Sequence, residues 1–238
     1  MVALTVVGII IGFLLLDLGI QYLGKRATAK APVYTIRPAA AQWNPAKLLS
    51  DFLMPLGFFF HPGHTWVRIH DRGTVTVGAD DFAQRVLGKI DRVTLPRVGQ
   101  ELKSNSPAFK VIQGQKEATF AAPVNGTVLE VNEDLLRNPE LLKNQPYKTG
   151  WVLKVRPSSI GDDLKSMVIA DNAVQWLKRE VGAFRDFLVE VAGRNSELGT
   201  TLADGGVPVS GVMEQFGPAD WKKFQQRFLS VDGRGDVA

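Results

Sequence analysis

The chain of 238 residues contains no cysteine and only three histidines, which limits the chemistry that it can perform. Without cysteine it has no disulfide, no thiolate metal site and no cysteine nucleophile. His61 and His64 are close in sequence, but no clear third ligand accompanies them, so we predict no metal site. The sequence also offers no Ser/His/Asp triad, no glycine-rich phosphate loop and no pair of catalytic carboxylates. We therefore predict that the chain is not an enzyme.

The sequence lacks a cluster of basic residues as well. Its 28 Lys and Arg are interspersed with 24 Asp and Glu, which gives a formal net charge of +4 at pH 7. Proteins that bind nucleic acid concentrate their positive charge on one face or along one helix. We therefore predict no nucleic-acid partner. The hydrophobic share of 45% is high enough for a sizeable core.

A long apolar run occupies residues 2–23, which read VALTVVGIIIGFLLLDLGIQYL. About 20 helical residues cross the hydrocarbon core of a bilayer, so the run predicts a transmembrane anchor at residues 1–24. A cleaved signal peptide is the alternative, but the run is too long and no charged region precedes it. Lys25 and Arg26 follow the run, and the positive-inside rule places the rest of the chain in the cytoplasm. We expect a single-pass protein of the bacterial inner (cytoplasmic) membrane, with the lipid bilayer as the partner of residues 2–23.

Asp17 is the one acidic residue in this apolar run. A carboxylate within a membrane span is costly unless it is hydrated near the headgroups or faces protein. Two interpretations therefore stay open for Asp17. It lies close to the interface, or it meets a partner helix inside the membrane.

Two segments separate the anchor from the main part of the chain. Residues 25–49 are rich in Ala, Pro and Lys and predict a linker. Residues 51–63 read DFLMPLGFFFHPG, which is strongly apolar but too short to cross a bilayer. The apolar stretch at 52–60 has three candidate contacts: its own domain, the bilayer surface or a partner protein. We expect it to pack on its own domain.

Alternating apolar and polar residues between positions 66 and 157 predict many short strands with close turns. This pattern is typical of a small barrel or sandwich, and we predict a β domain at residues 50–157. Within it, Asn125-Gly126 is a strong signal for a two-residue hairpin. Helical stretches interrupt the strands at residues 80–88 and 134–142.

After residue 157 the pattern changes to helix. An apolar stripe at alternating spacings of three and four predicts an amphipathic helix, and its members are Val174, Leu177, Val181, Phe184, Leu188 and Val191. The stripe packs either on its own β domain or, because the spacing suits a coiled coil, against another subunit. We assign residues 158–192 to a linker and this helix, and residues 193–238 to a tail. The tail contains a short helix that begins at Pro218, with one apolar side formed by Trp221, Phe224 and Phe228.

Four stretches in the middle of the chain resemble the H protein of the glycine cleavage system. They read HTWVRI (64–69), VGADDFAQRVLGKI (77–90), LPRVGQEL (95–102) and APVNGTVLEVNEDLLRNPELLKNQPYKTGWVLKVRP (122–157). The resemblance implies a mainly β, barrel-sandwich hybrid fold of the lipoyl/biotinyl kind. It also implies a carrier rather than a catalyst, because H proteins hold lipoate on a lysine at a hairpin tip.

The position of that lysine is where this sequence departs from the family. The family lysine lies eight residues before the proline of its Pro-Val-x-Gly hairpin, and eight residues before Pro123 is Gln115. Counting eight residues forward from the matching Pro107 also gives Gln115. Lys116 is one residue late, and Ile112 replaces the acidic residue that the family has three positions before its lysine. Glutamine occupies the slot unless the tip bulges, so we predict no lipoate and interpret Lys116 as a surface lysine.

These observations predict a membrane-anchored, non-catalytic subunit built on an H-protein-like domain. It would dock on the other subunits of a larger membrane protein complex at the cytoplasmic face. Similar H-like sequences without the lysine accompany bacterial membrane redox complexes, so a redox or electron-transfer complex is one candidate partner. The alternative is a membrane-tethered lipoyl carrier of the glycine cleavage type that uses Lys116. A third hypothesis is an assembly factor that binds such a complex transiently.

Overall fold

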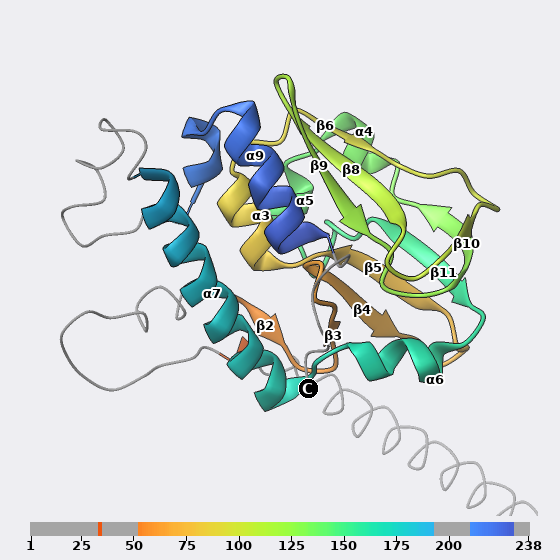
Figure 1. Cartoon of the computed structure of the whole chain (residues 1–238). Helices are drawn as coiled ribbons and strands as arrows, with labels where there is room; N and C mark the ends of the chain where they lie inside the picture. Colours follow the sequence, from red (N-terminus) through yellow and green to blue (C-terminus); the bar gives the residue numbers. More distant parts are fainter. Residues whose placement is uncertain (1–32, 35–51, 193–209, 231–238) are drawn as a thin grey trace, which may run out of the picture. The chain divides into compact units, whose positions relative to one another are not determined.

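A computed structural model describes residues 33–34, 52–192 and 210–230 of the chain (Figure 1). The predicted transmembrane anchor at residues 1–24, including Asp17, lies outside the described residues, as does most of the predicted linker. In the part that is described, no helix combines the length and the apolar character that a membrane crossing requires.

Three antiparallel sheets form the β part of the structure (Figure 1). The largest has the strand order β3-β4-β5-β11-β10-β7, with bounds Phe59–Phe60, Thr65–Ile69, Val75–Ala79, Leu153–Pro157, Gly126–Val131 and Glu101–Leu102. The second has the order β6-β8-β9, with bounds Arg92–Thr94, Pro107–Gln113 and Lys116–Ala121. The third pairs β1 (Val33–Tyr34) with β2 (Met54–Pro55), so the predicted linker contributes a short strand. The predicted sheet-rich fold with many short strands is confirmed.

Helices interrupt and follow the strands. The first described helix is α3 (Asp81–Leu87), where an oxygen of Asp80 accepts a hydrogen bond from the Ala83 N–H at 2.8 Å and so caps the helix. The stretch predicted as helical at 134–142 forms two short helices, α4 (Asp134–Arg137) and α5 (Leu141–Asn144). The C-terminal part contains α6 (Ile160–Asp163), η1 (Leu164–Ser166), α7 (Ala170–Ala192), η2 (Val212–Gln215), α9 (Pro218–Phe224) and the π-helical turn η3 (Gln225–Leu229).

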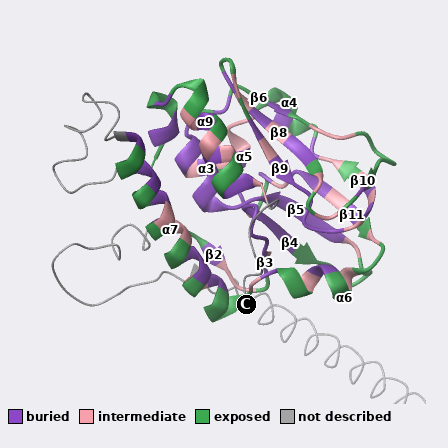
Figure 2. Ribbon diagram, in the orientation of Figure 1, coloured by how far each residue is buried: buried purple, intermediate pink, exposed green. Residues whose placement is uncertain are grey.

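The apolar stripe of α7 packs on its own domain and not on another subunit. Leu177, Val181, Phe184, Leu188 and Val191 are all buried, whereas Val174 is half-buried. Figure 2 shows buried and exposed residues alternating along this helix. The interpretation that left the stripe free for a coiled coil was wrong, because the apolar surface that such a seam needs is already covered.

Aromatic rings connect the C-terminal helices to the β domain. The Phe184 ring of α7 meets the Phe82 ring of α3 edge-on, with centroids 5.6 Å apart. The Phe228 ring lies 5.6 Å from Phe184 and 6.3 Å from Phe82. Phe224 completes the contact and is fully buried, as the predicted apolar side of the tail helix requires. The hydrophobic core is therefore continuous from the sheets into α7 and α9.

The apolar stretch at 52–60 also packs on the domain. Phe52, Met54, Phe58 and Phe60 are buried, and only Leu53 among its large apolar residues is notably exposed. Contact with protein, which we expected, is confirmed for these four side chains.

The hairpin predicted at Asn125-Gly126 does not exist. The strands on its two sides belong to different sheets, because β9 pairs with β8 whereas β10 pairs with β11 and β7. The Asn125 side chain accepts a hydrogen bond from the Ser104 N–H at 3.1 Å and donates another to Asp163. Gly126 is required by close packing, since a Cβ there would collide with the carbonyl oxygen of Arg156. The dipeptide therefore marks a crossing between sheets.

Candidate functional site: the tip of the β8–β9 hairpin

The β8–β9 hairpin ends in a two-residue turn. Gln113 and Lys116 form its last strand pair, which leaves Gly114 and Gln115 at the apex. Gly114 has φ +57°, and a glycine with positive φ at the first turn position is typical of a type II′ turn. Gln115 is exposed. The glutamine that the register count places in the family slot therefore lies at the outermost point of the hairpin.

Hydrogen bonds fasten the hairpin to the end of α3. The Gln113 Nε2 group donates to the carbonyl oxygens of Leu87 at 3.0 Å and Lys89 at 2.7 Å. Asp91 accepts a bond from the Gly114 N–H at 2.7 Å and pairs with the Lys89 ammonium at 2.8 Å. These two partners lower the pKa of Asp91. The tip is thus held from one side by the end of α3 and the loop between α3 and β6.

Lys116 is held from the other side by the C-terminal segment, which we define as residues 210–230. Its Nζ donates hydrogen bonds to the carbonyl oxygens of Glu214 at 2.9 Å, Met213 at 3.2 Å and Phe216 at 3.3 Å. A lysine ammonium has three donors, and here all three have an acceptor. Nζ also lies 4.7 Å from the centre of the Trp221 ring, a cation–π contact. Burial lowers the pKa of Lys116, and the negative charge of Glu214 acts against that shift.

The same segment also binds the backbone of β9. The Trp221 indole N–H donates to the carbonyl oxygen of Glu117 at 2.8 Å. The side-chain amide of Gln225 accepts a bond from the Thr119 N–H at 2.7 Å and donates to the Thr119 carbonyl oxygen at 2.9 Å. Because β9 is the outer strand of its sheet, these bonds run along an edge that no other strand of the described residues occupies.

A pocket of about 460 Å³ lies beside the tip. The hairpin and the end of α3 supply most of its lining, and the C-terminal segment supplies Glu214, Phe216 and Pro218. Charges of both signs line it, namely Lys89 and Lys116 against Asp91 and Glu214. The only amine nucleophiles at this pocket are therefore the two lysines, and Lys116 is already bound to three carbonyl oxygens.

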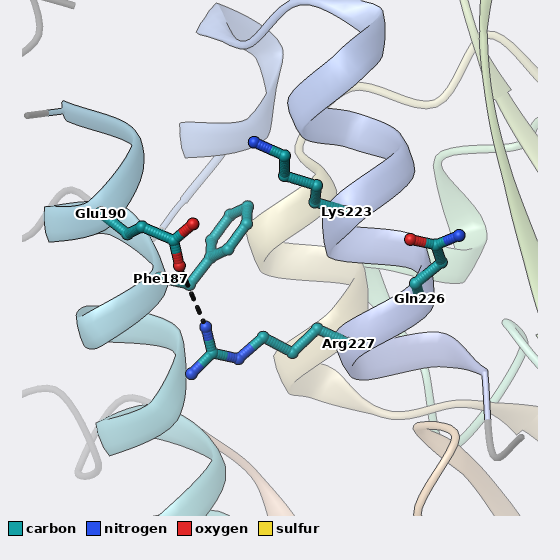
Figure 3. A pocket seen from close by; sticks show the side chains of 5 residues that line it. All are labelled: Phe187, Glu190, Lys223, Gln226 and Arg227. Carbon is teal, nitrogen blue, oxygen red and sulfur yellow. Dashed lines mark ion pairs between the residues drawn. The ribbon is translucent and has the colours of Figure 1, made fainter. Parts of the chain in front are cut away.

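A second pocket, of about 300 Å³, lies between α7 and the C-terminal segment (Figure 3). Its lining residues are Phe187, Glu190, Lys223, Gln226 and Arg227. Arg227 and Glu190 face each other across it, with Nη1 and Oε2 3.6 Å apart. The opposite charges therefore compensate one another within the groove.

The structure gives His61 and His64 separate partners. His61 Nδ1 accepts a hydrogen bond from the Gly63 N–H at 3.1 Å, so its Nε2–H donates to Asn105 at 3.0 Å. His64 Nδ1 lies 2.7 Å from a carboxylate oxygen of Asp80. Among the described residues, His, Asp and Glu side chains form no group of three or more that suits a metal ion.

His64 connects the β domain to α7. It is fully buried, with φ +58°, and its Nε2 lies 3.5 Å from the carboxylate of Glu180 on α7. Its ring stacks on Phe82 at 4.5 Å between centroids. Burial alone would lower the pKa of His64, but Asp80 and Glu180 together raise it above the usual value. The imidazole therefore lies between two carboxylates, which favour its protonated form.

Sequence reasoning missed the contacts that bind Lys116. The tail helix and its apolar side were predicted, and Trp221 was placed on that side. No residue pattern signals that three backbone carbonyl groups converge on a lysine almost 100 positions earlier in the chain. Gln225 likewise has no signature in the sequence.

Comparison with known proteins relates the middle of the chain to one family. The family model described as "Glycine cleavage H-protein" matches residues 59–180. A probable glycine cleavage system H protein from Thermococcus gammatolerans is 34% identical over 130 residues, which are 55% of this chain and 96% of that protein. The glycine cleavage system H protein of Vibrio cholerae is 41% identical over 122 residues, which are 51% of this chain and 95% of that protein.

A solved structure gives a similar coverage. The crystal structure of a glycine cleavage system H protein from Mycobacterium marinum is 26% identical, covers 50% of this chain and 94% of that chain, and has a TM-score of 0.45. The family match ends within α7, at residue 180. The C-terminal segment that binds Lys116 therefore lies beyond the part of the chain that the family model describes.

Proposed function

The chain belongs to the glycine cleavage H-protein family, and from this premise we propose that it is a non-catalytic, membrane-anchored member that no longer carries lipoate. It would serve as an accessory subunit, and its domain would dock on a larger membrane complex at the cytoplasmic face. A redox or electron-transfer complex is the candidate partner.

The observation that carries this proposal is the exposed Gln115 at the apex of the hairpin. Attachment of lipoate to a protein needs an amine that attacks the activated carboxyl group and becomes an amide. The nitrogen of a glutamine side chain is already part of an amide, so its lone pair is delocalised into the carbonyl group and does not attack. The residue at the apex therefore does not fit the prosthetic group of the family.

The neighbouring lysine does not fit it either. All three donors of the Lys116 ammonium point to carbonyl oxygens, and these hydrogen bonds must break before Nζ can react. Gln115 and Lys116 are the two residues at which lipoate could be attached, and both support a role other than lipoate transfer.

The proposed location rests on the sequence. Residues 2–23 are long and apolar enough to span a bilayer, and Lys25 and Arg26 follow them. The proposed partners are the other subunits of the complex. They would contact the domain on surfaces other than the apolar stripe of α7, which its own core covers.

Two measurements on protein from the native host test the proposal. Intact mass spectrometry is expected to show no lipoyl group. Purification in mild detergent is expected to recover integral membrane proteins in a fixed ratio to this chain. One added lipoyl group, lost in a Lys116→Ala variant, would refute the proposal. Recovery of the membrane proteins in small or variable amounts would favour an assembly factor that binds transiently.

A lipoyl carrier that uses Lys116 is the second candidate function. One observation favours it, since burial lowers the pKa of Lys116 and a lower pKa increases the fraction of neutral amine. This candidate requires the three carbonyl contacts to open before the amine can react. The same mass measurement distinguishes it from the proposed function.

A further inference from the structure

The C-terminal segment contacts β9 at three of its first four residues. It binds the side chain of Lys116 and then the backbone of Glu117 and Thr119. We propose that the C-terminal segment is a built-in cover that closes Lys116 to acyl-transferring enzymes. The segment lies beyond the family match, so the cover is an addition to the family domain.

Acyl transfer to a lysine has strict requirements. The ammonium first loses a proton, and the neutral Nζ then attacks the carbonyl carbon of an activated acyl donor. An amide bond forms, the leaving group departs and Nζ releases a second proton. In this structure the protons of the Lys116 ammonium bind the carbonyl groups of Met213, Glu214 and Phe216. A donor would also meet the Trp221 ring, which lies 4.7 Å from Nζ.

Buried aromatic side chains anchor the C-terminal segment in the core, so the segment stays in place as long as the chain is folded. Phe216, Trp221, Phe224 and Phe228 are all at least nine-tenths buried. Opening Lys116 by moving the whole segment would expose these four aromatic side chains to water, which is strongly unfavourable. The local contacts of Gln225 and Trp221 are therefore a better place to test the cover than removal of the segment.

The test is competitive labelling of the purified full-length chain with the N-hydroxysuccinimide ester of acetic acid, followed by peptide mass spectrometry. Lys110 on β8 is the internal reference, because its side chain is 42% exposed and its ion-pair partner Glu117 is exposed as well. We expect Lys116 to label at least about tenfold more slowly than Lys110, since hydrogen bonds to a charged group must break first. An uncovered lysine with a lowered pKa would label faster than an ordinary surface lysine.

Two adjacent glutamines provide a matched pair of variants. Gln225→Ala removes both bonds to Thr119 and is expected to raise the labelling rate of Lys116 several-fold. Gln226→Ala is the control, because Gln226 is exposed and lines the groove between α7 and the C-terminal segment (Figure 3). Thermal unfolding of each variant verifies that it is folded, and labelling is compared at a temperature where both are native.

Two results would overturn the cover. One is labelling of Lys116 in the unsubstituted chain as fast as Lys110, and the other is an equal rate increase in both glutamine variants. The biological meaning of the cover rests on the proposed function, but different results would refute the cover and the proposed function. A chain without lipoate whose Lys116 labels rapidly would refute the cover and leave the proposed function intact.

Discussion

Nε2 of His64 lies 3.5 Å from the carboxylate of Glu180, which brings a residue of the β domain into an ion pair with α7. The other ring nitrogen lies 2.7 Å from Asp80, and that aspartate also caps α3. One buried histidine thus connects the start of the β domain, α3 and the long helix α7.

This arrangement predicts how stability depends on pH. Because the folded pKa of His64 is raised above its unfolded value of about 6.5, the ion pairs contribute fully below that pH. Their contribution is lost as the pH rises through the folded pKa. Glu180→Gln is expected to lower the free energy of unfolding by about 1 kcal/mol at pH 6 and by less at pH 9. Urea unfolding at several pH values measures both quantities.

A second acid on α7 is the control for this prediction. Glu190 pairs with an arginine, Arg227, and not with a histidine, so Glu190→Gln should not change the pH dependence. If Glu180→Gln and the unsubstituted chain lose stability in parallel between pH 6 and 9, the pairing of His64 with Glu180 does not contribute to the pH dependence.

Two glycines are expected to respond to alanine in opposite directions. Gly126→Ala places a Cβ against the Arg156 carbonyl oxygen and should destabilise the chain by about 2 kcal/mol or more. Gly182→Ala lies within α7 and has no neighbouring atom within 4 Å of the new Cβ, so it should stabilise by about 0.5–1 kcal/mol. Thermal and urea unfolding measure both changes, and a stable Gly126→Ala protein would contradict the close approach of the two strands.

Restoring a lysine at the apex should restore modification. We expect Gln115→Lys, produced together with a lipoate ligase, to gain one lipoyl group in the intact mass, whereas the unsubstituted chain gains none. Adding Ile112→Glu supplies the acidic residue that the sequence lacks and should raise the modified fraction. Modification confined to Lys116 in these variants would show that position 115 does not decide acceptance.

The proposed anchor makes a prediction about fractionation. The full-length chain is expected to remain in the membrane pellet after a carbonate wash, because residues 2–23 would lie within the bilayer. A chain that begins at residue 25 should appear in the soluble fraction with an unchanged thermal transition of the domain. Release of the full-length chain by carbonate would argue against a spanning segment.

Local patterns in the sequence predicted the parts of the fold that depend on neighbouring residues. The alternation within β4 and β5, the stripe through Leu177 and Phe184, and the start of α9 at Pro218 all have short-range signals. The prediction of a hairpin at Asn125-Gly126 was wrong because the local turn preference of this dipeptide is the same in a hairpin and in a crossing between sheets. Only the pairing of β10 with β11 distinguishes the two, and that pairing joins residues that are far apart in sequence.

The candidate site shows the same limit. Counting from Pro107 and Pro123 placed Gln115 at the apex, and the structure has it there. The pairing is regular from Phe109–Phe120 to Gln113–Lys116, and the one register shift lies at the far end of the hairpin, between Pro107 and Phe109. The partners of Lys116 are backbone carbonyl groups, which every residue has. No count of residue types in the sequence could therefore identify them.

The pairing of Gln225 with Thr119 also bears on how copies of this chain coexist. The proposed membrane anchor would confine copies of this chain to one surface, where they would meet at a high effective concentration. An unpaired outer strand would then be a template on which a neighbouring copy could add its own strand. The side-chain amide of Gln225 presents one acceptor and one donor to Thr119, as a peptide group would, and so ends the ladder within the molecule. Neighbouring copies of the domain would therefore not add a strand to the β9 edge at Thr119.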